Sequence, residues 1–188
     1  MEKLVLTLTL IICLSSVFPL QLETHLVSGA KKITRLYFYL HDVIGGDRPT
    51  VWGVADCNLT DVLPSAFGKL VVLDNLVTYG PELDSGEVGR LQGTVGLADL
   101  REKALVMLLN LVFTKGEFEG STLSILGRNP LGAESREVSI VAGTGVFRMA
   151  AGYIITSTYY NDPAGVRNVY EYSAVVYHMD PNVVSLRR

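Results

Sequence analysis

The strongest constraint on the fold is a series of short segments in which apolar side chains recur at every second position. In residues 36–42, Leu36, Phe38 and Leu40 share one face of a strand, and Asp42 continues that face. His41 falls on the opposite face, which argues against a proton relay between His41 and Asp42. A period of two predicts a β-strand with one buried side.

Further segments rich in apolar, β-branched or aromatic residues follow, separated by turns that contain Gly, Pro or Asn. They are Val51–Ala55, Leu70–Leu73, Val88–Leu97, Ala104–Phe113, Thr122–Leu126, Val138–Ala142, Val146–Tyr159 and Val169–Tyr177. Ala104–Phe113 is long enough for a buried helix, but the neighbouring glycine turns favour a strand. Glycines inside several of these segments are typical of sheets that bend and close. We therefore expect one all-β domain, a sandwich or a barrel, and the glycines favour the barrel.

The first 24 residues have the pattern of a secretory signal peptide, with Lys3, an apolar run of about a dozen residues and then Pro19. A membrane-spanning helix would need about 20 apolar residues, and the run is too short. The expected organisation is a signal peptide at 1–24 with an undetermined cleavage site, a flexible segment at 25–32, the domain at 33–180 and a tail at 181–188. The mature chain is then expected in the extracellular space.

Secretion changes the meaning of the two cysteines. Cys13 is lost with the signal peptide, and Cys57 alone cannot form an internal disulfide. Stability must then come from a hydrophobic core. Asn58-Leu59-Thr60 is a glycosylation sequon, which makes Asn58 the expected attachment site in a surface turn.

Composition and motifs exclude several function classes. Net charge is −3 and the pI is near 5.6, so the chain lacks the basic character of nucleic-acid-binding domains. The scattered His25, His41 and His178 and the absence of a Cys pair give no metal-binding pattern. The sequence has no P-loop, dinucleotide-binding or nucleophile-elbow motif, so we expect no metal and no cofactor.

Two charged residues stand out. Asp42 continues an apolar strand face, where a carboxylate is costly unless it is paired or functional; the alternative is that it caps the turn at Gly45-Gly46. Arg136 begins a strand, and exposure rates for arginine favour an outward position at the rim.

Five motifs in order resemble the plant dirigent protein family, from about Ile33 to His178. They are Phe38-Tyr39-Leu40-His41-Asp42, Val88-Gly89-Arg90-Leu91-Gln92-Gly93, Gly120-Ser121-Thr122-Leu123 with Leu126-Gly127-Arg128-Asn129-Pro130, Arg136-Glu137, and Ala142 to Tyr153 around Gly143-Thr144-Gly145. The resemblance implies an eight-stranded antiparallel β-barrel, a homo-oligomer with a trimer favoured over a dimer, and secretion to the plant apoplast. It also implies no oxidative activity. A separate laccase or peroxidase supplies phenoxy radicals from monolignols such as coniferyl alcohol, and the barrel directs their coupling into optically active lignans or related phenylpropanoids.

The same resemblance assigns roles to single residues. Asp42 would face the interior and donate a proton to a quinone methide, and Arg136 would line the pocket and bind a phenolic oxygen. The matched motifs make Phe38, Asn129, Thr144 and Phe147 the substrate-binding candidates. The chain departs from the family pattern at Asn129, where some lignan-forming members carry a second aspartate, and at residues 74–81, where D-D-P-L-T-E-G-P is common.

Two other functions stay open. Similar barrels act as pterocarpan-synthase-like dehydratases, which remove water from isoflavanols through a quinone methide and need an acid but no oxidase. A phenol-binding scaffold in plant defence or cell-wall assembly, without stereocontrol, is the third.

Overall fold

The structure, a computed structural model, describes residues 31–180. Within them, nine strands and two single-turn 3-10 helices follow one another along the chain. Their bounds are β1 (Lys31–Val43), β2 (Val51–Ala55), β3 (Leu70–Thr78), β4 (Glu87–Leu97), β5 (Ala104–Phe113), η1 (Gly116–Phe118), β6 (Thr122–Pro130), β7 (Ser135–Thr144), η2 (Gly145–Phe147), β8 (Ala151–Asn161) and β9 (Arg167–Met179).

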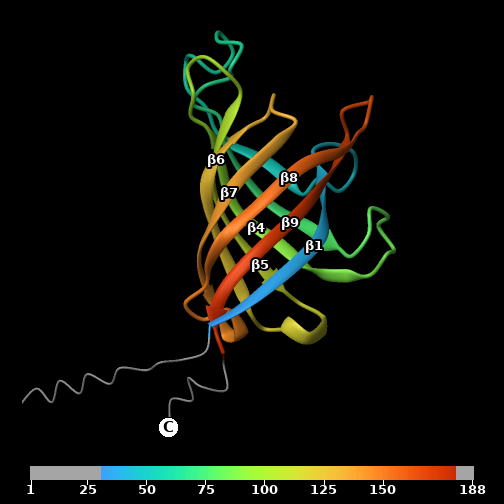
Figure 1. Cartoon of the computed structure of the whole chain (residues 1–188). Coiled ribbons are helices and arrows are strands. Elements are labelled where there is room, and N and C mark those ends of the chain that lie inside the picture. Colours follow the sequence, from blue (N-terminus) through green and yellow to red (C-terminus); the bar gives the residue numbers. More distant parts are fainter. Residues whose placement is uncertain (1–30, 181–188) are drawn as a thin grey trace, which may run out of the picture.

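The strands form one antiparallel sheet that closes on itself (Figure 1). The order is β1-β9-β8-β7-β6-β5-β4-β3-β2, and the free edge of β3 is shared between two partners. Residues 70–73 of β3 pair with β2, whereas Leu76–Thr78 pair with His41, Leu40 and Tyr39 of β1. Strand β1 therefore closes an eight-stranded barrel against β3, as predicted from the sequence, and β2 extends the wall beside that seam.

Glycines allow the strands to approach at the bends of this barrel. Gly93 has φ +144°, and a Cβ atom there would lie 2.2 Å from the carbonyl oxygen of Leu108 on β5. A Cβ atom at Gly89 would lie 2.0 Å from the carbonyl oxygen of Val112. The sequence predicts that glycines inside the strands accompany the bending and closure of the sheet, and at these two positions a side chain would collide with the neighbouring strand.

The structure decides two segments that the sequence left less certain, residues 104–113 and 146–159. Ala104–Phe113 is strand β5, in which buried and more exposed positions alternate. The expectation of one continuous strand over Val146–Tyr159 is wrong. Gly145 has φ +61° and Met149 has φ +60°, so the chain makes a 3-10 turn there and β8 begins only at Ala151.

An aromatic cluster fills one end of the barrel. Phe113, Phe118 and Phe147 are mutually in contact, with ring centroids 4.9–5.6 Å apart, and Phe147 also meets the ring of His178 at 5.2 Å. Figure 1 shows η1, which carries Phe118, at the end opposite the 98–103 hairpin. Phe147 is fully buried, so this end has a packed hydrophobic core.

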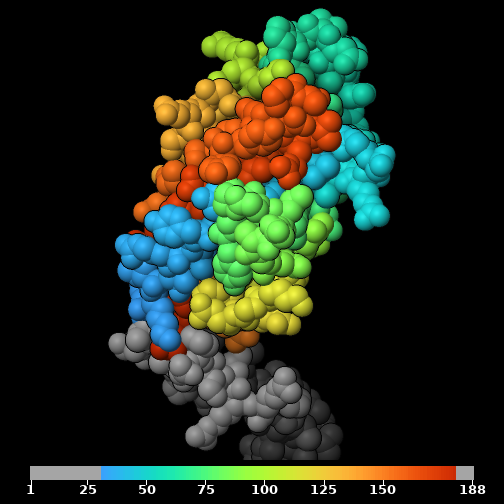
Figure 2. Space-filling model, turned by 90° about the vertical axis from the view of Figure 1, so that its right-hand side faces the viewer, coloured from blue at the N-terminus to red at the C-terminus, as the bar shows by residue number. Residues whose placement is uncertain are grey.

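The loop 79–86 covers the outside of the seam between β1 and β3. Figure 2 shows it beside β1, above the 115–119 segment. It explains why His41 is buried although it lies on the face of β1 opposite Leu40. The His41 Nε2 atom lies 2.8 Å from the Thr78 hydroxyl, which in turn donates to the carbonyl oxygen of Gly80.

The expected signal peptide at 1–24 and the tail at 181–188 lie outside the described residues. Within residues 31–180, no helix is long and apolar enough to cross a bilayer.

Candidate functional site

A cavity of about 510 Å³ occupies the end of the barrel away from the aromatic cluster. One wall is aliphatic, and its residues come mainly from β3, β4 and β5: Leu73, Leu91, Val95, Leu105, Met107 and Leu109. The other wall carries polar groups, and these are Asp42, Asn75, Asn129, Arg136, Thr156, Tyr170 and Tyr172. Such a division suits a ligand with an apolar body and a few polar atoms.

Asp42 lies inside the barrel, on the face predicted from the sequence. Its register partner on β9 is Asn168, two positions beyond the pair of Leu40 and Tyr170 on the same face of the sheet. Burial raises the pKa of the Asp42 carboxyl above its ordinary value, and hydrogen bonds from Asn75 and Asn168 act in the opposite direction. The amide of Asn75 donates to Asp42 Oδ1 at 2.8 Å. Asp42 is therefore a partly buried acid whose neutral form is favoured by its surroundings.

Arg136 faces the same cavity, so the expectation of an outward rim charge is wrong. Its exposed fraction is 3%, because its inward position on β7 places the guanidinium under the ring of Tyr170, 5.5 Å from the ring centroid. One of its terminal nitrogens donates to the Thr158 hydroxyl at 3.2 Å. Among the described residues it has no salt-bridge partner within 4 Å. This cation is balanced by an aromatic face rather than by a carboxylate.

Three buried polar atoms in the cavity wall lack a hydrogen-bond partner within residues 31–180: Asn129 Oδ1, Arg136 Nε and Thr156 Oγ1. Leaving a buried polar atom unpaired costs roughly 1–3 kcal/mol. Asn129 Oδ1 is an acceptor, Arg136 Nε is a donor and the Thr156 hydroxyl can be either, so the cavity has unsatisfied capacity for a ligand that carries hydroxyl or carbonyl groups.

Two tyrosines complete the polar wall, Tyr172 fully buried and Tyr170 partly buried. Burial and the Asp42 charge raise the pKa of Tyr170 to about 12. The pKa of Tyr172 is also raised, chiefly by burial. Both phenols are therefore neutral over the physiological range. The ring of Tyr172 stacks on Phe38 at 5.2 Å, which joins this wall to the core below.

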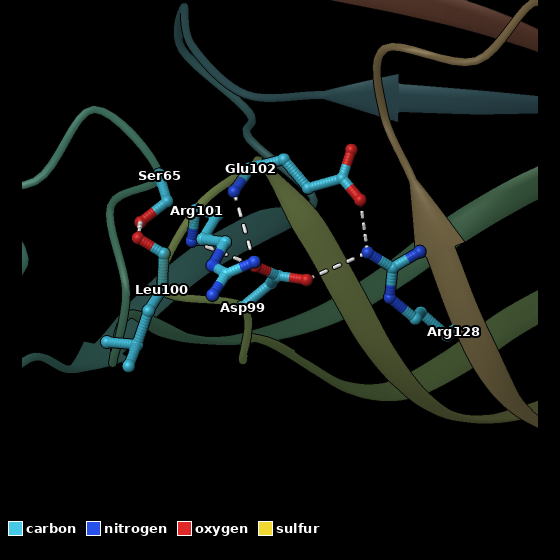
Figure 3. Close-up of polar contacts among 6 residues, drawn as sticks. All are labelled: Ser65, Asp99, Leu100, Arg101, Glu102 and Arg128. Carbon is cyan, nitrogen blue, oxygen red and sulfur yellow. Dashed lines mark hydrogen bonds and ion pairs between the residues drawn. The ribbon is translucent and has the colours of Figure 1, made fainter.

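The rim of the cavity is held by an ion-pair cluster on the 98–103 hairpin (Figure 3). Arg128 on β6 contacts both Asp99 and Glu102, and its distance to Asp99 Oδ2 is 2.8 Å. The hydrogen bond from Arg128 lowers the pKa of Asp99 to about 2. The Ser65 hydroxyl donates to the carbonyl oxygen of Leu100 at 3.3 Å, so the hairpin is also joined to the loop before β3. We call Asp99, Glu102 and Arg128 the rim cluster.

The structure brings together three of the residues singled out in the sequence: Asp42, Arg136 and Asn129 all line the cavity. It does not bring Phe38, Thr144 and Phe147 there. Phe38 and Phe147 are fully buried in the packed core, and the Thr144 hydroxyl is at the surface, 2.7 Å from that of Thr122. Asn58 is exposed in the turn after β2.

Sequence reasoning missed several cavity residues. Asn75 shares the inward face of β3 with Leu73 and Val77, so extending the period-two pattern past Leu73 would have found it. Tyr170 and Tyr172 fall on one face of β9, but tyrosines in strands pack against cores so often that no signal separated them.

No group of three or more His, Cys, Asp or Glu side chains with the geometry of a metal site exists among residues 31–180.

Comparisons with known proteins give one consistent picture. A family model described as Dirigent-like protein matches residues 33–177. Dirigent protein 11 of Arabidopsis thaliana is 44% identical over 147 residues, which cover 78% of this chain and 75% of the relative. Pterocarpan synthase 1 of Glycyrrhiza echinata is 42% identical over 149 residues, 79% of each chain. A solved structure of a pterocarpan synthase dirigent protein superposes with a TM-score of 0.77 at 39% identity and covers 86% of this chain and 91% of that one.

Proposed function

This chain belongs to the dirigent-like protein family, and on that premise we propose that its cavity binds phenolic molecules and steers a quinone methide derived from them. Asp42 is the proton donor in this proposal, and Arg136 binds a phenolic oxygen. The observation that carries it is an acid inside a largely apolar cavity, on the wall that also carries Arg136, with the pKa of Asp42 raised by burial.

The leading reaction is stereoselective coupling of monolignol radicals such as those of coniferyl alcohol. A separate oxidase removes one electron and one proton from each phenol. Two radicals held in one relative orientation then form a carbon–carbon bond and give a bis(quinone methide). Each ring closes when a side-chain hydroxyl attacks the quinone methide carbon; a quinone methide oxygen takes a proton from Asp42, and the attacking hydroxyl returns one. Tenfold preference for one enantiomer requires only about 1.4 kcal/mol between two bound poses.

The second candidate is dehydration of an isoflavanol to a pterocarpan. The pterocarpan synthases among the relatives favour it, and so does the amide at position 129, which leaves Asp42 as the carboxylic acid of the cavity wall. Asp42 would protonate the departing hydroxyl and take the proton that the conjugated phenol loses, so that water leaves and a neutral quinone methide forms. A second phenolic hydroxyl would then attack the quinone methide carbon, and Asp42 would protonate the quinone methide oxygen and take the proton of the attacking hydroxyl. This reaction consumes no oxidant.

One experiment with two arms separates these reactions. In the first, coniferyl alcohol is oxidised by a laccase with and without the protein, and the products are resolved by chiral chromatography. In the second, the purified protein alone is given a 2′-hydroxyisoflavanol. Optical activity in the first arm supports coupling, and turnover in the second supports dehydration. Racemic products and no turnover, together with measurable phenol binding, would leave only a defence or cell-wall scaffold.

We also propose where the protein acts and how it assembles. Secretion to the apoplast would bring the barrel to laccases and peroxidases. On this route Asn58 would carry a glycan. One register row across the outside of the barrel carries, together with Thr94 and Ser139, four exposed apolar or aromatic side chains: Val72, Leu108, Leu126 and Tyr153. A homo-oligomer, with a trimer favoured, would cover it.

A further inference from the structure

We infer that Asn75, oriented by Thr50, is a positioning residue for Asp42. It holds Asp42 Oδ1 as a hydrogen-bond acceptor and so leaves Oδ2 as the oxygen that carries the transferable proton. The inference rests on the proposed function only for the use made of that proton.

Three hydrogen bonds in series link the Val43 amide to Asp42 through Thr50 and Asn75, and we call this chain of hydrogen bonds the relay. The Val43 amide donates to the Thr50 hydroxyl oxygen at 3.2 Å, and the Thr50 hydroxyl donates to Asn75 Oδ1 at 2.5 Å. Asn75 Nδ2 then donates to Asp42 Oδ1 at 2.8 Å. Because the Thr50 oxygen accepts from a backbone N–H, its own proton is free to donate. Asn75 Oδ1 faces Thr50 and Nδ2 faces Asp42, and this is the orientation that an ionised Asp42 carboxylate requires, because a carboxylate can only accept.

The backbone fixes Thr50 at this position. The Thr50 N–H donates to the carbonyl oxygen of Val43 at 2.8 Å, and the Asp74 N–H donates to the carbonyl oxygen of Thr50 at 2.9 Å. Thr50 is thus attached to the end of β1 on one side and to β3 on the other. Asp74 precedes Asn75, so the residue that orients the amide is bonded to the strand that carries it.

The burial of Asn75 shows that its side chain does more than fill space. The Asn75 side chain is fully buried, and a buried amide is costly unless its donor and acceptor are both used. Here the acceptor is used by Thr50 and the donor by Asp42. A leucine would fill similar space at lower desolvation cost, so the amide at this position is explained by the acid that it contacts.

The relay assigns different tasks to the two carboxyl oxygens. In the neutral acid, a donor at Oδ1 favours the carbonyl form of that oxygen and places the proton on Oδ2. When Oδ2 gives up its proton, Asn75 still donates to Oδ1 and stabilises the carboxylate, against the desolvation that opposes it. The acid can then be reprotonated by the hydroxyl that closes the ring.

Other groups around Asp42 have to be kept constant in any test. Tyr170 and Asn168 face it from β9, Arg136 lies across the cavity on β7, and Lys69 lines the cavity just before β3. His41, on the same strand, faces away and bonds to Thr78. None of these residues is altered in the variants below.

The test is a pH titration of the Asp42 carboxyl carbon by NMR in the full-length protein, with its signal identified by its loss in Asp42→Asn. Asn75→Leu removes the donor, and its titration midpoint should rise by about one pH unit, as expected from the loss of a hydrogen bond to a charged group. Thr50→Val leaves the amide but removes its orientation, and the midpoint should rise by less. Thr50→Ser keeps the hydroxyl and should titrate as the native protein does. Asn110→Leu is the matched control, because Asn110 is an exposed amide that accepts from Ser124 and lies far along the barrel wall on β5.

An unchanged midpoint in Thr50→Val overturns the inference, even where Asn75→Leu fails to fold. A change in Thr50→Ser equal to that in Thr50→Val also overturns it, because the hydroxyl would then not be responsible. The proposed function fails separately: if Asp42→Asn forms the same products with the same stereochemistry while the midpoints shift as expected, the relay exists but Asp42 is not the acid of the reaction.

Discussion

The two ends of this barrel are built from the same strands, but one end is filled with aromatic side chains and the other encloses a cavity. Near η1, the inward side chains of β5 and of the segment after β7 are Phe113 and Phe147, and they pack ring against ring. Towards the 98–103 hairpin, β5 turns Met107 inward and β1 turns Asp42 inward, and a cavity of about 510 Å³ remains. The filled end supplies the packing that lets the open end keep polar atoms without partners.

The two ends also differ in what they contribute to the stability of the fold. A domain without an internal disulfide depends on its core, and the rings of the aromatic cluster are part of that core or pack against it. The open end costs stability, because Asn129 Oδ1 and Arg136 Nε are buried without partners among the described residues. Stability and ligand binding should therefore respond to different substitutions.

The largest expected effect comes from breaking the filled end. Phe147→Ala removes a fully buried ring that contacts Phe113, Phe118 and His178, and it should lower the free energy of unfolding by about 3–5 kcal/mol. Urea denaturation followed by circular dichroism measures this. A loss below about 1 kcal/mol would show that the cluster is not the stabilising core. Any folded Phe147→Ala protein should bind phenols with native affinity.

At the open end the expected change is in binding. Arg136→Met removes a charged donor, so the dissociation constant for coniferyl alcohol should rise by roughly 10- to 150-fold, the equivalent of about 1.5–3 kcal/mol for one charge-assisted hydrogen bond. The free energy of unfolding should stay the same or increase, because a buried cation without a carboxylate partner is replaced by an apolar side chain. Isothermal titration calorimetry and denaturation are run on the same samples.

The control for that prediction is Arg148→Met, since Arg148 is an exposed arginine outside the cavity. If Arg136→Met binds phenol as tightly as Arg148→Met does, Arg136 has no direct role in ligand binding.

A smaller effect is expected in the pH dependence of stability. The pKa of Asp42 is raised in the folded state, so the folded protein holds a proton that the unfolded chain has released. Stability from this group is therefore complete at low pH and falls as the pH rises from about 3.8, the ordinary value, through the raised pKa. Asp42→Asn should lack this decline. Thermal unfolding of both proteins across that range measures the difference, and parallel curves would contradict it.

The smallest effect belongs to the rim cluster, which is exposed. Arg128→Gln should lower the free energy of unfolding only slightly, because solvent screens the ion pairs, and high salt should reduce the difference further. The hairpin would be held less firmly, so ligand dissociation should become faster in stopped-flow fluorescence. An unchanged dissociation rate would limit the rim cluster to a surface role.

The sequence was sufficient for the fold and for the inward face of β1. Alternation placed Leu40 and Asp42 inside the barrel, because a strand face is decided by parity alone. Parity does not say how far along the barrel axis a residue lies. Phe38 and Asp42 share a face, yet Phe38 is in the packed core and Asp42 is in the cavity.

Arg136 and Asn75 show a second limit. General exposure rates place an arginine outside, and only the three-dimensional closure of the sheet sets Arg136 beneath Tyr170. Asn75 is oriented by Thr50, which is 25 residues away in sequence, and it reaches Asp42 across the β1–β3 seam, which is a long-range contact. Local patterns carry no information about such a seam.

The central claim is that a single acid at the open end directs the reaction of a phenol-derived quinone methide. Its most direct test is to compare native protein with Asp42→Asn, which is nearly the same size and cannot donate an acidic proton, in both the laccase-driven coupling of coniferyl alcohol and the isoflavanol assay. We predict that the reaction performed by the native protein loses its optical activity or its turnover in Asp42→Asn, with phenol binding retained. Undiminished stereoselectivity and turnover in that variant would contradict the account.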